Sequence, residues 1–150
     1  MKKVVLLGDS IRLYGYGTVI KEYLPKDIEI YQPEDNCRFA KYTLRMLFDL
    51  QEQIKGADVI HWNNGLWDTC ALFGDDIPFS PVEDYVNTMS RVADILLRLG
   101  KKTIFSTTTP IKTGQPHNTN ERIEDFNKKV TAMLSKKGII INDLYSVIAK

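Results

Sequence analysis

The chain has 150 residues, of which 43% are hydrophobic and 26% are charged, and its formal net charge is +1. This composition is typical of one soluble globular domain, here residues 1–150, that can bury a core without disulfides or a metal. A net charge near zero gives no field that would attract nucleic acid or an anionic membrane, so neither is expected as a partner. Two cysteines are too few for a disulfide framework, and no apolar run is long enough for a transmembrane helix or a signal peptide. We therefore expect a cytoplasmic protein in a reducing environment.

The first half of the chain alternates between strand and helix patterns. In chain order, we predict a strand at residues 3–8, a helix at 18–24, a strand at 28–31, a helix at 39–54 and a strand at 57–62. A polar loop then covers residues 63–80.

The same alternation continues in the second half. Ser80, Pro81 and Glu83 predict a helix start, with Ser80 as the cap and Glu83 completing a capping box, and Gly100 ends this helix. A strand is predicted at 102–107, a helix from Thr119 or Asn120 to Gly138, and a last strand at 139–141.

Five strands separated by helix-length segments predict an α/β three-layer sandwich. The expected sheet is parallel, with the flavodoxin-like strand order 2-1-3-4-5. Residues 145–150 can form only about the first turn of a helix, so we expect the final C-terminal helix to be missing or shortened and the domain to be truncated there. Apolar surface would then be exposed on one sheet face, and we expect another chain, such as the second copy of a homodimer, or a rearranged terminus to cover it.

Polar residues follow each predicted strand, where parallel sheets gather their chemistry. They are Gly8-Asp9-Ser10, Asn36-Cys37-Arg38, Asn63 to Asp68, Thr107 to Pro110, and Asn142-Asp143. All of them should project over one edge of the sheet. Ser10 is placed there as a candidate nucleophile.

Two of these segments resemble blocks of the SGNH (GDSL) hydrolase family. Gly8-Asp9-Ser10-Ile11 looks like its first block, and Gly65-Leu66-Trp67-Asp68 resembles its third block, Gly-x-Asn-Asp. The resemblance implies that Ser10 is the nucleophile and that its backbone N–H helps to form the oxyanion hole. Trp67 stands where the family has an oxyanion-hole asparagine, so Asn63 or Asn64 is expected to substitute. The implied substrate is a small ester or a carbohydrate ester, contacted by Asp9, Cys37, Arg38, Gly65, Trp67 and Asp68.

The general base is the difficult part of this assignment, because a serine hydroxyl is a poor nucleophile without one. The last block of the family, Asp-x-x-His, has no counterpart, since Asp143-Leu144-Tyr145-Ser146 ends in serine. The chain has two histidines. His61 lies inside a predicted strand and is expected to be structural. His117, in the loop after the fourth strand, is the candidate base, although a solvated surface histidine is the alternative.

The sequence thus supports an SGNH-type serine esterase or acyl hydrolase. The alternative is a catalytically impaired or truncated protein of the same fold that binds a small molecule or a partner without hydrolysis. Nucleotide binding is disfavoured because no Gly-x-Gly-x-x-Gly or P-loop motif is present. No cofactor is implied, and no spacing typical of metal ligands occurs.

Overall fold

A computed structural model describes all residues, 1–150. It contains a five-stranded parallel sheet in the order β2-β1-β3-β4-β5, as predicted. The strands are β1 (Lys2–Leu7), β2 (Ile28–Tyr31), β3 (Val59–Trp62), β4 (Thr103–Ser106) and β5 (Ile140–Asn142).

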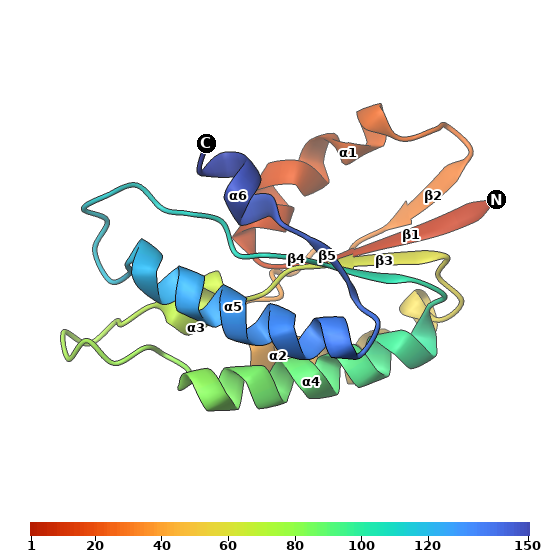
Figure 1. Cartoon of the computed structure of the whole chain (residues 1–150). Coiled ribbons are helices and arrows are strands. Elements are labelled where there is room, and N and C mark those ends of the chain that lie inside the picture. Colours follow the sequence, from red (N-terminus) through yellow and green to blue (C-terminus); the bar gives the residue numbers. More distant parts are fainter.

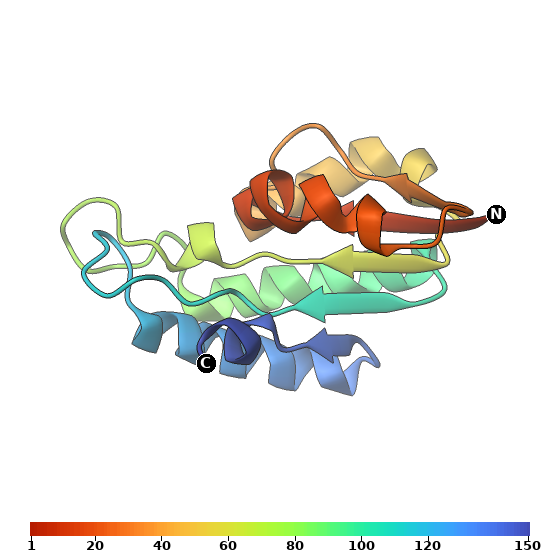
Figure 2. The same ribbon diagram turned by 90° about the horizontal axis from the view of Figure 1, so that it is seen from above.

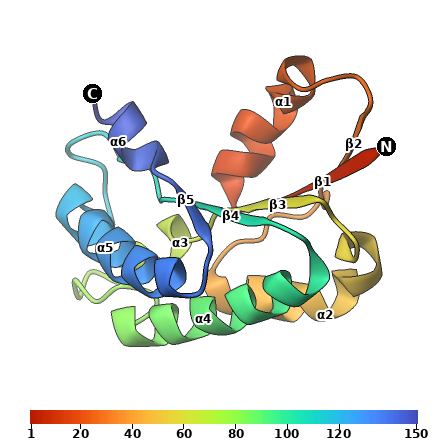
Figure 3. The ribbon, with the colours of Figure 1, turned by 45° about the vertical axis from the view of Figure 1, so that its right-hand side comes forward.

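Helices cover both faces of the sheet, which makes the molecule a three-layer sandwich (Figures 1 and 3). One face carries α2 (Ala40–Ile54), α4 (Val82–Leu99) and α5 (Asn120–Lys136). The other carries the π-helical turn η1 (Ile11–Tyr16), α1 (Gly17–Tyr23) and the short α6 (Leu144–Ile148). A single helical turn, α3 (Leu66–Thr69), follows β3.

The main core lies between the sheet and α2, α4 and α5. Alternate strand residues point into it, because successive side chains of a strand face opposite sides of the sheet. Leu7, Trp62 and Phe105 are examples, each no more than 1% exposed. Helix α4 meets them with Met89, Val92 and Leu96, whose spacing of three and four residues keeps them on one helix face.

The structure differs from the predicted elements at two loops. A helical segment begins directly after Ser10, at Ile11, and not at residue 18. The predicted capping box at Ser80 is wrong: α4 has no side-chain cap bond, and the Ser80 hydroxyl donates to Asp68 instead. The predicted cap at Thr119 is confirmed, since its hydroxyl accepts from the Arg122 N–H.

The C-terminal helix is short, as expected, and it covers its sheet face incompletely. Val59 and Ile104 are only partly buried on that face, and Ile140 is 45% exposed. Helix α6 lies along the same side of the sheet as α1 (Figure 3). None of the helices combines the length and the apolar character needed to cross a lipid bilayer.

Candidate active site

Ser10 lies immediately after the turn that ends β1, at the N-terminus of η1. The Asp9 carboxylate accepts the Ile11 N–H at 2.9 Å, and the Asp9 carbonyl accepts from the backbone of Arg12 and Leu13. These bonds fix the chain on both sides of Ser10. Neither the hydroxyl nor the backbone N–H of Ser10 has a hydrogen-bond partner, and the residue is half-buried. Both groups are therefore free to meet a ligand at this sheet edge.

A buried chain of hydrogen bonds runs beneath Ser10. Asn63 donates its amide to Asp9 Oδ1 at 2.9 Å and accepts from the Tyr16 hydroxyl at 2.6 Å. Burial raises the pKa of Asp9, while its bonds to Ile11 and Asn63 oppose that shift. The Asn63 side chain thus holds Asp9 in place, and it forms no hydrogen bond with Ser10.

One central residue of the site, Arg12, was not predicted from the sequence. Its side chain is completely buried, and its guanidinium donates to the carbonyls of Gly8 (3.1 Å), Pro33 and Asp35 (2.8 Å each). Because Arg12 spans the turn after β1 and the loop after β2, it fixes these two segments relative to each other. Only a helix starting directly after Ser10 brings Arg12 back over the Gly8 carbonyl, four residues earlier.

The loop after β2 places Cys37 and Arg38 in different surroundings. Cys37 is fully buried, its Sγ accepts the Gly8 N–H at 3.3 Å, and burial raises its thiol pKa. Arg38 is partly exposed, with its guanidinium 4.7 Å from the centre of the Tyr42 ring and 3.7 Å from the Asp35 carboxylate. Of these two predicted contact residues, only Arg38 has a side chain at the surface.

Asn64 and Gly65 hold the loop after β3 against α4 and the loop after β4. The Asn64 carbonyl accepts from the Tyr85 and Thr108 hydroxyls. Asn64 accepts from the Trp62 indole at 2.7 Å and donates to the Arg38 carbonyl at 3.0 Å. Gly65 has a φ of +151°, and a Cβ there would lie 2.1 Å from Thr108 Oγ1. Both residues are buried and serve the packing of this loop.

Asp68 and Trp67 belong to α3 and face opposite ways. The buried Asp68 carboxylate accepts the Ala40 N–H at the start of α2 and the Ser80 hydroxyl, and burial raises its pKa to about 6. Trp67 is 40% exposed, and its ring centre is 6.5 Å from that of Phe39, which is 5.0 Å from that of Phe79. We call Phe39, Trp67 and Phe79 the aromatic ledge.

The two histidines lie apart from Ser10 in the hydrogen-bond network. His61 packs edge-on against Tyr16 (ring centres 5.2 Å apart), and burial lowers its pKa to about 4, so it is neutral at physiological pH. His117 is exposed, has a φ of +71°, and accepts the Ala71 N–H with its carbonyl at 2.7 Å. Figure 2 shows the loops after β3 and β4 extending together beyond the carboxyl ends of the strands. No hydrogen bond joins either histidine to Ser10.

Comparison with known proteins gives structural relatives only. No family model matches the chain, and no curated protein matches it in sequence. An α/β hydrolase from the metagenome of Lake Arreo, Spain, superposes with a TM-score of 0.76 at 14% identity, over 98% of this chain and 78% of that one. The acetylxylan esterase Axe2 from Geobacillus stearothermophilus gives 0.73 at 12% identity, over 99% and 80%. A GDSL-like lipase from Bacteroides thetaiotaomicron gives 0.68 at 14% identity, over 93% and 67%.

The fold is that of the SGNH hydrolases. The fold class suggested by Gly8-Asp9-Ser10 and by the strand order is therefore confirmed. At identities this low the likeness concerns the fold, and function has to be argued from the site itself.

The end of β5 is a second place, after Trp67, where the sequence departs from the SGNH pattern. The Asp143 carboxylate accepts from the Thr107 hydroxyl at 3.2 Å and from both the backbone and the hydroxyl of Ser146. The Ser146 hydroxyl lowers the pKa of Asp143. Ser146 thus stands three residues after this aspartate, at the sequence position where the SGNH pattern has its histidine.

The structure separates the predicted site residues into two groups. Ser10, Arg38 and Trp67 are accessible near the carboxyl ends of β1, β2 and β3. The side chains of Asp9, Cys37, Asn63, Asn64 and Asp68 lie inside the fold and support the loops that present them. His117 is tied to the loop after α3 through Ala71.

Proposed function

We propose that the protein is a serine esterase of the SGNH type, with Ser10 as its nucleophile. The observation that carries this proposal is the state of Ser10. The residue is half-buried, and its hydroxyl and its backbone N–H are both without a hydrogen-bond partner, on a turn whose neighbouring groups are almost all hydrogen-bonded. A nucleophile and an oxyanion donor are two of the groups that acyl transfer requires, the third being a general base.

The mechanism would proceed through an acyl-enzyme. The Ser10 oxygen attacks the ester carbonyl and loses its proton to a base, while the Ser10 N–H donates to the oxyanion. Collapse of the tetrahedral intermediate expels the alcohol, which takes up that proton, and water then releases the acid from Ser10. His117 is our candidate for the base, because its loop lies at the same sheet edge.

We propose a small acyl group on a carbohydrate as the substrate class. The aromatic ledge supports this choice, since exposed aromatic rings offer flat apolar faces on which a sugar ring can stack. Among the similar structures, Axe2 is described as an acetylxylan esterase. Arg38, beside Tyr42, would contact the polar rim of such a ligand.

Hydrolysis of p-nitrophenyl acetate by the protein and its Ser10→Ala variant tests the nucleophile. We expect the variant to lose at least about 10²-fold in kcat/KM, and an acyl adduct on Ser10 in the unsubstituted protein by mass spectrometry. Equal rates for the two proteins would remove the esterase assignment. His117→Ala should lower the rate comparably, and a full rate would exclude His117 as the base.

One observation favours a second candidate, a non-hydrolytic binding protein of the same fold. Asp143 accepts a hydrogen bond from Ser146, which stands at the position where the family has a histidine. The usual base is thus replaced by a hydroxyl that is not basic at neutral pH. This alternative expects identical slow rates for Ser10→Ala and the unsubstituted protein. It also expects calorimetric binding of acetylated xylooligosaccharide that is lost on Trp67→Ala.

A further inference from the structure

A groove between α2 and α4 lies apart from Ser10 and the residues around it. Its volume is about 740 Å³, and its lining residues come from α2 and α4, which pack against each other on one face of the sheet (Figure 3). None of the candidate active-site residues lines it. The groove therefore has to be explained separately from the proposed esterase activity.

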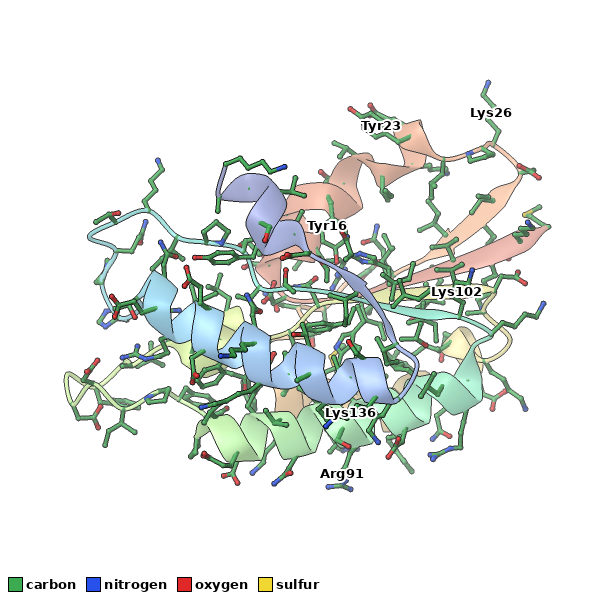
Figure 4. All side chains as sticks on the ribbon, in the orientation of Figure 1. Tyr16, Tyr23, Lys26, Arg91, Lys102 and Lys136 are labelled. Carbon is green, nitrogen blue, oxygen red and sulfur yellow. The ribbon has the colours of Figure 1, made fainter.

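All the charged side chains that line this groove are positive. Lys41 and Arg45 from α2 and Arg91 and Arg98 from α4 line it, and no aspartate or glutamate does. Of these four, only Arg45 forms an ion pair, with Asp49 at 3.0 Å. Figure 4 shows Arg91 projecting from α4 away from the body of the molecule. Because the whole chain carries a net charge of only +1, this concentration of cations is a local feature.

An apolar floor separates the two rows of cations. It is made by Leu44, Leu47 and Phe48 of α2 and by Ile95 of α4. Phe48 is 71% exposed, with the Arg45 guanidinium 5.2 Å from its ring centre. Exposed apolar surface rimmed by like charges has an energetic cost in the free protein that a complementary partner would relieve.

We propose that the α2–α4 groove binds an acidic amphipathic helix of a partner protein. The apolar face of such a helix would cover Leu44, Phe48 and Ile95, and glutamates or aspartates on its two flanks would meet the cation rows. The residues of α2 that line the groove run from Lys41 to Gln51, a length of roughly 15 Å, which is about three turns of the partner. A nucleic-acid backbone would use the cations and leave the apolar floor exposed, whereas an amphipathic helix satisfies both.

Fluorescence anisotropy with a labelled 18-residue helical peptide tests the proposal. The peptide carries leucines on one face and glutamates on both flanks. We expect a micromolar Kd that weakens as salt is raised, because the flanking pairs are screened. The double variant Arg91→Glu, Arg98→Glu should lose at least about tenfold in affinity, and Phe48→Ser about fivefold. The matched control is Lys21→Glu, Lys26→Glu, which makes the same change of charge on the α1 side of the sheet and should stay within about twofold.

Four results would overturn the inference, given variants that keep the circular dichroism spectrum of the unsubstituted protein. The first is no binding of the peptide. The second is equal binding of a peptide with glutamine in place of glutamate. The third is equal loss of affinity in the Lys21, Lys26 control. The fourth is binding to phosphatidylserine vesicles that is tighter than binding to the peptide and that is lost in the Arg91→Glu, Arg98→Glu variant. This result would identify the groove as a membrane-binding surface instead.

Discussion

At the scale of single residues, the geometry around Ser10 depends on Gly8. In the structure its φ is not positive, and the reason for glycine is close packing. A Cβ at this position would lie 2.1 Å from Asn63 Oδ1 and 2.8 Å from the Arg12 Cβ.

We predict that Gly8→Ala destabilises the protein by about 1–3 kcal/mol, because the added methyl forces Asn63 away from Asp9 and Arg12 away from its carbonyls. Urea unfolding followed by circular dichroism measures this change. Ser10→Ala is the matched control in the same turn. It removes an unbonded hydroxyl and should change the free energy of unfolding by less than about 0.5 kcal/mol. Equal stability of Gly8→Ala and the unsubstituted protein would contradict the packing seen here.

Asp68 makes stability depend on pH. Its pKa is raised from 3.8 to about 6 in the folded state, so the folded protein holds a proton that the unfolded chain releases between these values. Stability contributed by this group is therefore present near pH 4, falls as the pH rises to about 6, and is constant above that.

The corresponding prediction compares the protein with Asp68→Asn, in which this group cannot titrate. The unsubstituted protein should gain up to about 3 kcal/mol relative to the variant on going from pH 7 to pH 4. Urea unfolding at both pH values measures the difference. Asp9 and His61 titrate in both proteins, so their effects cancel. A difference that does not change with pH would show that Asp68 is not proton-linked to folding.

At the scale of elements, the strands followed from the sequence and the segment after Ser10 did not. Each strand is an apolar run bounded by polar residues, and this pattern is set locally. Turn η1 contains Arg12, whose charge argues against burial until the carbonyls of the β2 loop are brought to it. The capping box at Ser80 failed for a similar reason, since a buried carboxylate from α3 competes for the hydroxyl.

The start of α6 offers a test of the proposed esterase function. Asp143 accepts the Ser146 N–H and hydroxyl, so a side chain at position 146 lies beside a carboxylate that could orient an imidazole. In the His117→Ala background, which lacks our candidate base, we predict that adding Ser146→His raises kcat for p-nitrophenyl acetate by at least about 10²-fold, the usual contribution of a positioned general base.

The gain should vanish when Ser10→Ala is added as well, which controls for imidazole acting without the serine. An unchanged rate when Ser146→His is added to a folded His117→Ala protein would mean that α6 does not present position 146 to Ser10.

At the scale of the whole molecule, the sheet face between α1 and α6 remains partly open. Ile140 is 45% exposed there, and Val147 and Ile148 of α6 are 63% and 51% exposed. Tyr23 of α1 is also exposed (Figure 4). We propose that a second copy of the chain covers this face, because the same apolar strip on each copy can pair with itself about a two-fold axis.

Sedimentation velocity provides the measurement. We expect a dimer at tens of micromolar protein and a monomer for Ile140→Asp, since a buried unpaired carboxylate is costly. Phe48→Asp, on the opposite side of the sheet, should remain dimeric. A monomer of the unsubstituted protein throughout this range would refute the dimer.

The sequence by itself determined the layered α/β architecture, the strand order and the placement of Ser10 at the carboxyl edge of the sheet. The architecture and the position of Ser10 follow from hydrophobic periodicity and from the handedness of parallel connections, which are local rules, and the strand order was expected by analogy with flavodoxin-like sheets. It also showed that Asp143 is followed by Ser146 where a histidine is usual. Only the tertiary structure decided which polar residues are available at that edge. The side chains of Arg12, Asn63 and Asn64 form their hydrogen bonds with groups inside the fold. These donors and acceptors belong to distant segments and meet only when the loops after β1, β2 and β3 pack together.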